Sequence, residues 1–171
     1  GRPCRPDVRG WARRDHPERT SCRGSRLGAR ASFQPLLIAV RLRGAKDGAA
    51  YLETVRLCEL FDFRVYVWMK KQSRAGQTQL FRLGYNYYHN ENLQALLNAI
   101  REALSWYCTN EQFQQRFKDE TANWYDWGGI KYYLYEYEEH LALEAGVPVR
   151  MPWDYLEKAR KEDTIEHVLP Q

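Results

Sequence analysis

The fold of this chain is decided by the stretch Leu93–Tyr107, LQALLNAIREALSWY. Its large apolar residues recur at offsets 0, 3, 4, 7, 11 and 14, which places them all on one face of an α-helix: Leu93, Leu96, Leu97, Ile100, Leu104 and Tyr107. Asn92 directly precedes the run, and its side chain is suited to capping the first turn. The stretch therefore predicts an amphipathic helix that packs on a hydrophobic core.

Three further helices are predicted upstream of this stretch. Pro35 suits the first turn of a short helix that ends in the loop Gly44–Gly48. A second helix is expected from Ala49 to about Lys71, and a third over Gln77–Tyr88. Within the second helix, Phe63–Trp68 alternates and is rich in β-branched residues, so a strand is the competing interpretation there. We favour the helix.

Downstream of Tyr107, two more helices are expected. Thr109 and Gln112 have the spacing of a capping box, and Phe113 and Phe117 form an apolar pair one turn apart. After a break over Asp119–Gly129, one apolar stripe predicts a helix of about 15 residues: Ile130, Tyr133, Leu134, Tyr137 and Leu141. Gly146 occupies the position of a C-terminal cap for this helix.

The last part of the chain changes its periodicity. Trp153–Lys161 can form a brief helix, whereas Asp163–Leu169 alternates with period two, which is typical of a strand. The chain has 171 residues, of which 44% are hydrophobic, enough for one domain with a core. We therefore expect a mainly α fold, with one helical domain over residues 33–162.

The N-terminal residues 1–32 differ from the rest in composition. Residues 1–30 hold nine Arg against three acidic residues, a charge of +6, so the net charge of +4 leaves −2 for the remainder. This stretch has few large apolar residues, so we expect it to be disordered. It is either a basic arm on phosphates, a disordered leader, or a stretch that is not native. Because the body is mildly acidic, bulk charge is poor evidence for DNA binding.

The cysteine spacing and the hydropathy argue against a zinc or redox site, a membrane span and a secretory signal. Cys4, Cys22, Cys58 and Cys108 match no paired zinc-ligand or redox spacing, so we expect buried or idle thiols. No apolar run approaches the roughly 18 residues of a membrane span, and the N-terminus lacks the apolar core of a secretory signal. The expected location is the cytoplasm, with no membrane partner.

The most informative motif is Asp163–Gln171, DTIEHVLPQ. Glu166 and His167 stand side by side near the end of the expected strand, and Pro170 ends it. A carboxylate can help to hold a divalent metal while a neutral imidazole takes a proton from water that attacks phosphorus. On the pattern alone, the alternative is an ordinary surface histidine.

Thr164–Gln171 resembles the IEHILPQ signature in the C-terminal domain of GmrSD-type restriction endonucleases, whose His-x-x-Pro element is related to HNH nucleases. Two further stretches are similar to the same family. They are Asn123–Glu138, and Arg64-Val65-Tyr66 followed by Ala75-Gly76-Gln77. The resemblance covers roughly Phe33 to Gln171.

The resemblance implies a modification-dependent restriction endonuclease that acts in phage defence. It implies His167 as the general base and Glu166 as a ligand of a divalent metal such as Mg²⁺, although Glu is one methylene longer than the Asp of HNH sites. It also implies that the chain is a fragment: residues 163–171 would form the first strand of a truncated HNH-like ββα-metal unit, with further catalytic residues beyond Gln171. A nucleotide would be bound by an N-terminal ParB-like domain outside this chain. The partner would be DNA, including modified DNA, and this fragment alone would be inactive.

Two other groups of residues are candidates for DNA binding. Arg64, Lys70, Lys71 and Arg74 form the densest basic group of the body and are candidate phosphate contacts, or else a solvated helix end. An aromatic cluster is a base-stacking platform, a pocket for a modified base or, as we favour, part of the core: Trp124, Tyr125, Trp127, Tyr132, Tyr133, Tyr135 and Tyr137. In the core interpretation, Tyr133 and Tyr137 are expected to be buried and Tyr132 and Tyr135 to be exposed. His89 and His140 are taken as ordinary histidines. The competing function is a non-catalytic helical interaction or scaffold module.

Overall fold

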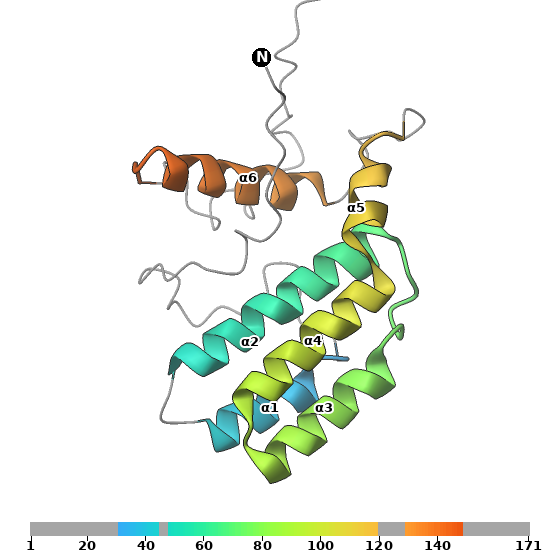
Figure 1. Ribbon diagram of the computed structural model, residues 1–171, viewed down its shortest axis with the longest axis vertical. Coiled ribbons are helices and arrows are strands. Elements are labelled where there is room, and N and C mark those ends of the chain that lie inside the picture. Colours follow the sequence, from blue (N-terminus) through green and yellow to red (C-terminus); the bar gives the residue numbers. More distant parts are fainter. Residues whose placement is uncertain (1–30, 45–47, 120–128, 149–171) are drawn as a thin grey trace, which may run out of the picture. The chain divides into compact units, whose positions relative to one another are not determined.

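The computed structural model describes residues 31–44, 48–119 and 129–148 (Figure 1). The chain divides into two compact units between Glu120 and Thr121, and each unit is described by itself. This division falls inside the range 33–162 that the sequence suggests as one helical domain. The expected strand Asp163–Leu169 and the tail 1–30 lie outside the described residues.

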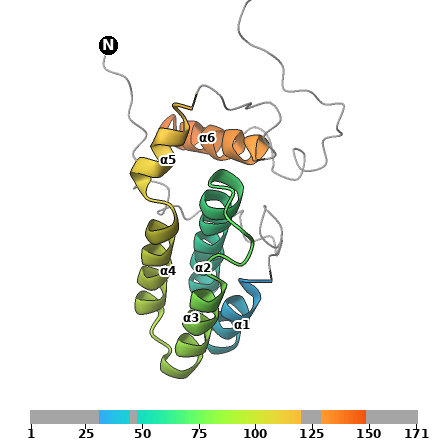
Figure 2. The ribbon, with the colours of Figure 1, turned by 90° about the vertical axis from the view of Figure 1, so that its right-hand side faces the viewer.

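Every regular element within the described ranges is helical, which confirms the mainly α fold class. The first unit contains α1 (Gln34–Arg43), α2 (Gly48–Phe61), the π-helical segment η3 (Asp62–Trp68), α3 (Gln77–Asn90), α4 (Leu93–Tyr107) and α5 (Asn110–Arg116). The second unit contains α6 (Ile130–Glu144). Figures 1 and 2 show α2, α3 and α4 running alongside one another, with α1 next to α3.

The aromatic residues around η3 form the centre of the first unit. Phe61, Phe63 and Trp68 are fully buried. The ring of Trp68 lies 4.9 Å from that of Phe113, and the ring of Phe61 lies 5.9 Å from that of Tyr107. Burying each such side chain stabilises the folded state by about 1.5–3 kcal/mol. These ring contacts pack η3 and the end of α2 against α4 and α5.

The two predicted helix caps are confirmed. The Asn92 side chain accepts a hydrogen bond from the main-chain N–H of Ala95 at 3.0 Å at the start of α4. At the start of α5, Thr109 accepts from the N–H of Gln112 at 3.2 Å, and the Gln112 side chain accepts from the N–H of Thr109 at 3.0 Å. Both caps satisfy main-chain donors that the first helical turn leaves free.

The segment that also suggested a strand is a π-helix. Residues 62–68 continue directly from α2, and the helix closes when the N–H of Met69 donates to the carbonyl of Arg64, five residues back, at 3.1 Å. Six of the seven residues of η3 are buried. The alternating pattern of this segment therefore does not separate a buried face from an exposed one, because nearly the whole turn is enclosed.

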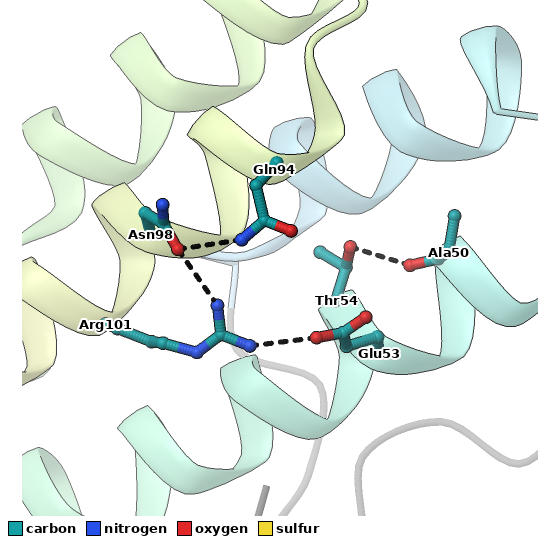
Figure 3. Close-up of polar contacts among 6 residues, drawn as sticks. All are labelled: Ala50, Glu53, Thr54, Gln94, Asn98 and Arg101. Carbon is teal, nitrogen blue, oxygen red and sulfur yellow. Dashed lines mark hydrogen bonds and ion pairs between the residues drawn. The ribbon is translucent and has the colours of Figure 1, made fainter. Parts of the chain in front are cut away.

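A polar network links α2 to α4 across their contact (Figure 3). Arg101 on α4 forms an ion pair with Glu53 on α2 at 2.8 Å and donates to the side chain of Asn98 at 3.2 Å. Both charged side chains are about two-fifths exposed, so the pair contributes about 0–1 kcal/mol. The network therefore ties α2 to α4 at this point but adds little to the stability of their contact.

The prediction of which side chains of α6 are buried is wrong. Tyr132 and Tyr135 are buried, whereas Tyr137 is 43% exposed and Leu134 is 42% exposed. Tyr133 is half-buried, and its ring stacks on that of Tyr137 at 6.4 Å. Apolar and aromatic residues occur all around this helix, so periodicity alone does not identify the buried face. Its end is as expected, since Gly146 adopts a left-handed conformation with φ of 67°.

Candidate nucleic-acid interface

The loop of residues 69–76 joins η3 to α3 and carries three of the four cations suggested as phosphate contacts (Figure 1). Lys70, Lys71 and Arg74 all have exposed side chains. None of them forms an ion pair or side-chain hydrogen bond with another residue in the part of the chain that the structure describes. Their charges are therefore available to an anionic partner.

The first half of this loop is shaped by the end of the π-helix. The N–H of Lys71 donates to the carbonyl of Val65 at 3.0 Å, next to the bond from Met69 to Arg64. Between these two donors, Lys70 adopts a left-handed conformation with φ of 52°, which is uncommon for a residue other than glycine. The chain thus reverses within two residues, and neighbouring lysines project from the turn.

The second half of the loop is tied to the core by side chains. The buried Tyr66 donates its hydroxyl proton to the carbonyl of Ala75 at 2.6 Å. The Ser32 hydroxyl donates to the carbonyl of Ser73 at 3.2 Å. Because Tyr66 of η3 and Ser32, just before α1, both bond to the loop, its three cations stand on a backbone that side chains hold in place.

Gly76 ends the loop and begins α3. Its φ of 77° is left-handed, and a Cβ there would lie 3.0 Å from Phe61 Cζ and 3.1 Å from Tyr107 Cε2. Any larger residue would therefore meet both strain and a packed aromatic wall. Glycine at position 76 therefore allows the loop to pack closely against the aromatic core.

Arg64 does not belong to this surface group. Its side chain is 6% exposed, and its guanidinium donates to the carbonyl of Cys108 at 2.8 Å and lies 4.9 Å from the centre of the Phe113 ring. Arg64 therefore serves the packing between η3, α4 and α5, and it is not available to phosphates. Proximity in the sequence grouped it with the lysines, whereas the π-helix turns it inward.

A second surface feature lies on α3, and the sequence reasoning missed it. Phe81, Tyr85 and Tyr88 are all exposed. They are spaced at i, i+4 and i+7, which places their side chains on one side of the helix. The absence of any Asp or Glu from residue 63 to residue 90 is the sequence signal that could have identified this region.

The residues that the resemblance assigns to catalysis, Glu166 and His167, lie outside the described residues. Within the described ranges, no group of three or more His, Cys, Asp or Glu side chains could hold a metal ion. The described structure therefore contributes an exposed basic loop to the candidate site, and the metal-binding residues remain a prediction from the motif.

The described cysteines are buried, and the two described histidines lie at or near the surface. Cys58 and Cys108 are buried, as expected for thiols in a core, and burial raises the pKa of both. His89 is exposed and its ring contacts that of Tyr85 at 4.5 Å. His140 forms an ion pair with Glu144 one turn along α6, at 3.4 Å.

No protein-family model, no curated protein and no solved structure matches this chain. The resemblance to GmrSD-type endonucleases therefore stays a prediction from the sequence motifs alone. No helix within residues 31–44, 48–119 and 129–148 has the length and apolar character needed to cross a membrane. The function is proposed from these motifs together with the basic loop.

Proposed function

We propose that this chain is part of a cytoplasmic DNA endonuclease similar to the GmrSD-type restriction family, which hydrolyses phosphodiesters of phage DNA. The observation that carries the proposal is the motif Asp163–Gln171, in which Glu166 and His167 precede Pro170. The exposed, unpaired cations of the loop 69–76 support a DNA partner.

The chemistry assigned to the motif divides between two side chains. His167 accepts a proton from the water molecule whose oxygen attacks phosphorus, and the leaving 3′ or 5′ oxygen departs from the phosphate. Glu166 helps to hold a divalent cation such as Mg²⁺, which supplies charge neutralisation at the phosphate when it is bound. The remaining residues of an HNH-like site are expected downstream of Gln171, and nucleotide hydrolysis is expected from a separate N-terminal domain.

The basic loop is assigned to the DNA backbone. Lys70, Lys71 and Arg74 lie within five residues on a backbone held by Tyr66 and Ser32. Phosphate contacts of this kind position a duplex without reading its sequence. In this arrangement the loop contributes affinity, and the choice of modified base is made elsewhere.

The catalytic assignment is tested in the parent protein, which would supply both the N-terminal nucleotide-binding domain and the residues downstream of Gln171. Phage DNA with modified cytosines is incubated with Mg²⁺ and nucleotide. His167→Ala should lower the cleavage rate about 10²- to 10⁴-fold without lowering the melting temperature. Glu166→Ala should raise the Mg²⁺ concentration needed for cleavage. His140→Ala, which removes a histidine of α6, is the control; wild-type cleavage by His167→Ala would refute the assignment.

The backbone contact is tested separately by binding. Lys71→Gln/Arg74→Gln should weaken binding to a DNA duplex and reduce the steepness of its salt dependence by about 2 in log–log slope. Arg116→Gln/Lys118→Gln removes one Arg and one Lys from the end of α5 and is the matched control. Equal losses in the two double variants would show that only net charge matters.

A second candidate is a helical interaction module without chemistry of its own. It is favoured by the exposed apolar side chains on α6, namely Leu134, Tyr137 and Leu141. In that case Glu166 and His167 are ordinary strand residues, and the cleavage experiment above yields no product that depends on His167.

A further inference from the structure

We infer that the exposed aromatic face of α3 binds single-stranded DNA by stacking bases on Phe81, Tyr85 and Tyr88. This surface adjoins the basic loop but uses a different kind of contact, with the faces of bases rather than with phosphates. The inference rests on the proposed DNA partner for the choice of DNA over RNA, and on the structure for the rest.

The three aromatic side chains lie on one side of α3, spaced at i, i+4 and i+7, with basic groups beside them. Tyr85 is 67% exposed, and its ring contacts that of His89 at 4.5 Å. The guanidinium of Arg43 lies 4.4 Å from the centre of the Tyr88 ring. A row of partly exposed rings is costly to leave in water, and stacking on a flat partner removes that cost.

The charge of the same region selects an anionic partner. No Asp or Glu occurs in α3 or in the loop before it, and the first carboxylate, Glu91, is paired with Arg43 at 3.2 Å. Arg82, next to Phe81, is exposed and has no ion pair in the described part of the chain. A protein partner that binds by apolar contacts would not require this region to lack acidic residues. A polyanion with aromatic bases matches both the lack of acidic residues and the exposed rings.

The spacing of the rings suits a strand of bases. Phe81 and Tyr85 are four residues apart, which is about 6 Å along the axis of a helix. A base inserted between two rings needs two stacking steps of about 3.4 Å each, or roughly 6.8 Å in all. The rise between the two residues is therefore close to the spacing that one base stacked between two rings requires.

The ligand is a single strand because the faces of bases in a duplex are already covered by their neighbours. Proteins that bind single strands combine a cationic path for the backbone with aromatic rings for the bases. Here the path is provided by the loop cations and Arg82, and the rings follow along α3. Lys71 and Arg74 would hold the phosphates at one end of this path.

The test measures binding of a fluorescent oligo(dT) of about 20 nucleotides to the full chain by anisotropy. Phe81→Ala/Tyr85→Ala should weaken binding by about 5-fold or more per ring. Trp106→Ala is the matched control, since Trp106 is an exposed aromatic on α4, and it should leave binding unchanged. Circular dichroism melts check that each variant folds.

A pair of single variants separates stacking from general hydrophobic contact. Tyr85→Phe keeps the ring and should bind as the wild type does, whereas Tyr85→Leu keeps apolar volume without a ring and should bind more weakly. Equal affinity of Tyr85→Leu and the wild type would overturn the inference, and so would equal losses in the α3 and Trp106 variants. Tighter binding of oligo(U) than of oligo(dT) would overturn the choice of DNA.

A failure of this inference can be distinguished from a failure of the nuclease proposal. If the cleavage test fails while Tyr85-dependent binding of oligo(dT) is found, the stacking surface stands and the catalytic assignment falls. If DNA is cleaved in a His167-dependent manner but oligo(dT) binding is unaffected by the ring variants, the endonuclease assignment stands and the stacking surface is refuted.

Discussion

The guanidinium of Arg64 donates a hydrogen bond to the main-chain carbonyl of Cys108 at 2.8 Å, across 44 residues of sequence. Cys108 caps the C-terminal end of α4, where the last carbonyls of a helix have no partner within it. A buried cation therefore satisfies a helix end and joins η3 to α4. Because Arg64 makes this buried contact, only Lys70, Lys71 and Arg74 of the basic group remain available to a ligand.

Arg64→Met should lower the free energy of unfolding by about 1.5–3 kcal/mol, because a charged hydrogen bond is lost and a buried carbonyl is left unpaired. Lys71→Met, at an exposed position, should change it by less than about 0.5 kcal/mol. Urea denaturation measures both. At a temperature where both are folded, only Lys71→Met should weaken duplex binding, and the reverse result would contradict the separation of the two residues.

Gly84→Ala should destabilise the contact between α1 and α3. A Cβ at Gly84 would lie 2.9 Å from Leu36 Cα and 3.1 Å from its main-chain N, so the helices would have to move apart. The expected loss is about 1–3 kcal/mol in thermal or urea unfolding. Gly48→Ala is the control, because a Cβ there meets nothing within 4 Å, and it should be neutral or slightly stabilising.

Tyr66→Phe removes the hydrogen bond to Ala75 that holds the basic loop. We expect a loss of about 0.5–1.5 kcal/mol in stability, together with weaker duplex binding because the three cations lose their fixed backbone. Hydrogen exchange at residues 70–75 should become faster in the variant. Unchanged exchange and affinity would show that the hydrogen bond from Tyr66 does not hold the loop.

Stability should fall in alkaline solution through the two buried thiols. Burial raises the pKa of Cys58 and Cys108, so above about pH 8.5 the unfolded chain releases these protons while the folded chain keeps them. The folded state then binds more protons than the unfolded state, and stability decreases with rising pH, by up to about 1.4 kcal/mol per pH unit from the fully buried Cys58. Urea melts at pH 8 to 10 measure the slope. Cys58→Ala should make the slope shallower, and an unchanged slope in that variant would contradict the assignment.

The local structure was predictable where it depends on residues three or four positions apart. The stripe from Leu93 to Leu104, the Asn92 cap and the capping box of Thr109 and Gln112 all occur as predicted. The reason is that a helix brings these positions together by its own geometry, and the caps use donors of its first turn. The motif around His167 is equally local, and its function remains a proposal.

The sequence by itself determined the helical class of this protein, most helix boundaries and the charge segregation between Asp62 and Glu91. Only the tertiary structure decided that Arg64 points inward, that Tyr132 and Tyr135 are the buried tyrosines of α6, and that the rings of α3 are exposed. Burial depends on which distant segment covers a side chain: Arg64 is buried by residues more than 40 positions away, and aromatic residues around α6 offered several equally apolar faces. Such choices are made by packing between elements, which a pattern confined to one element does not contain.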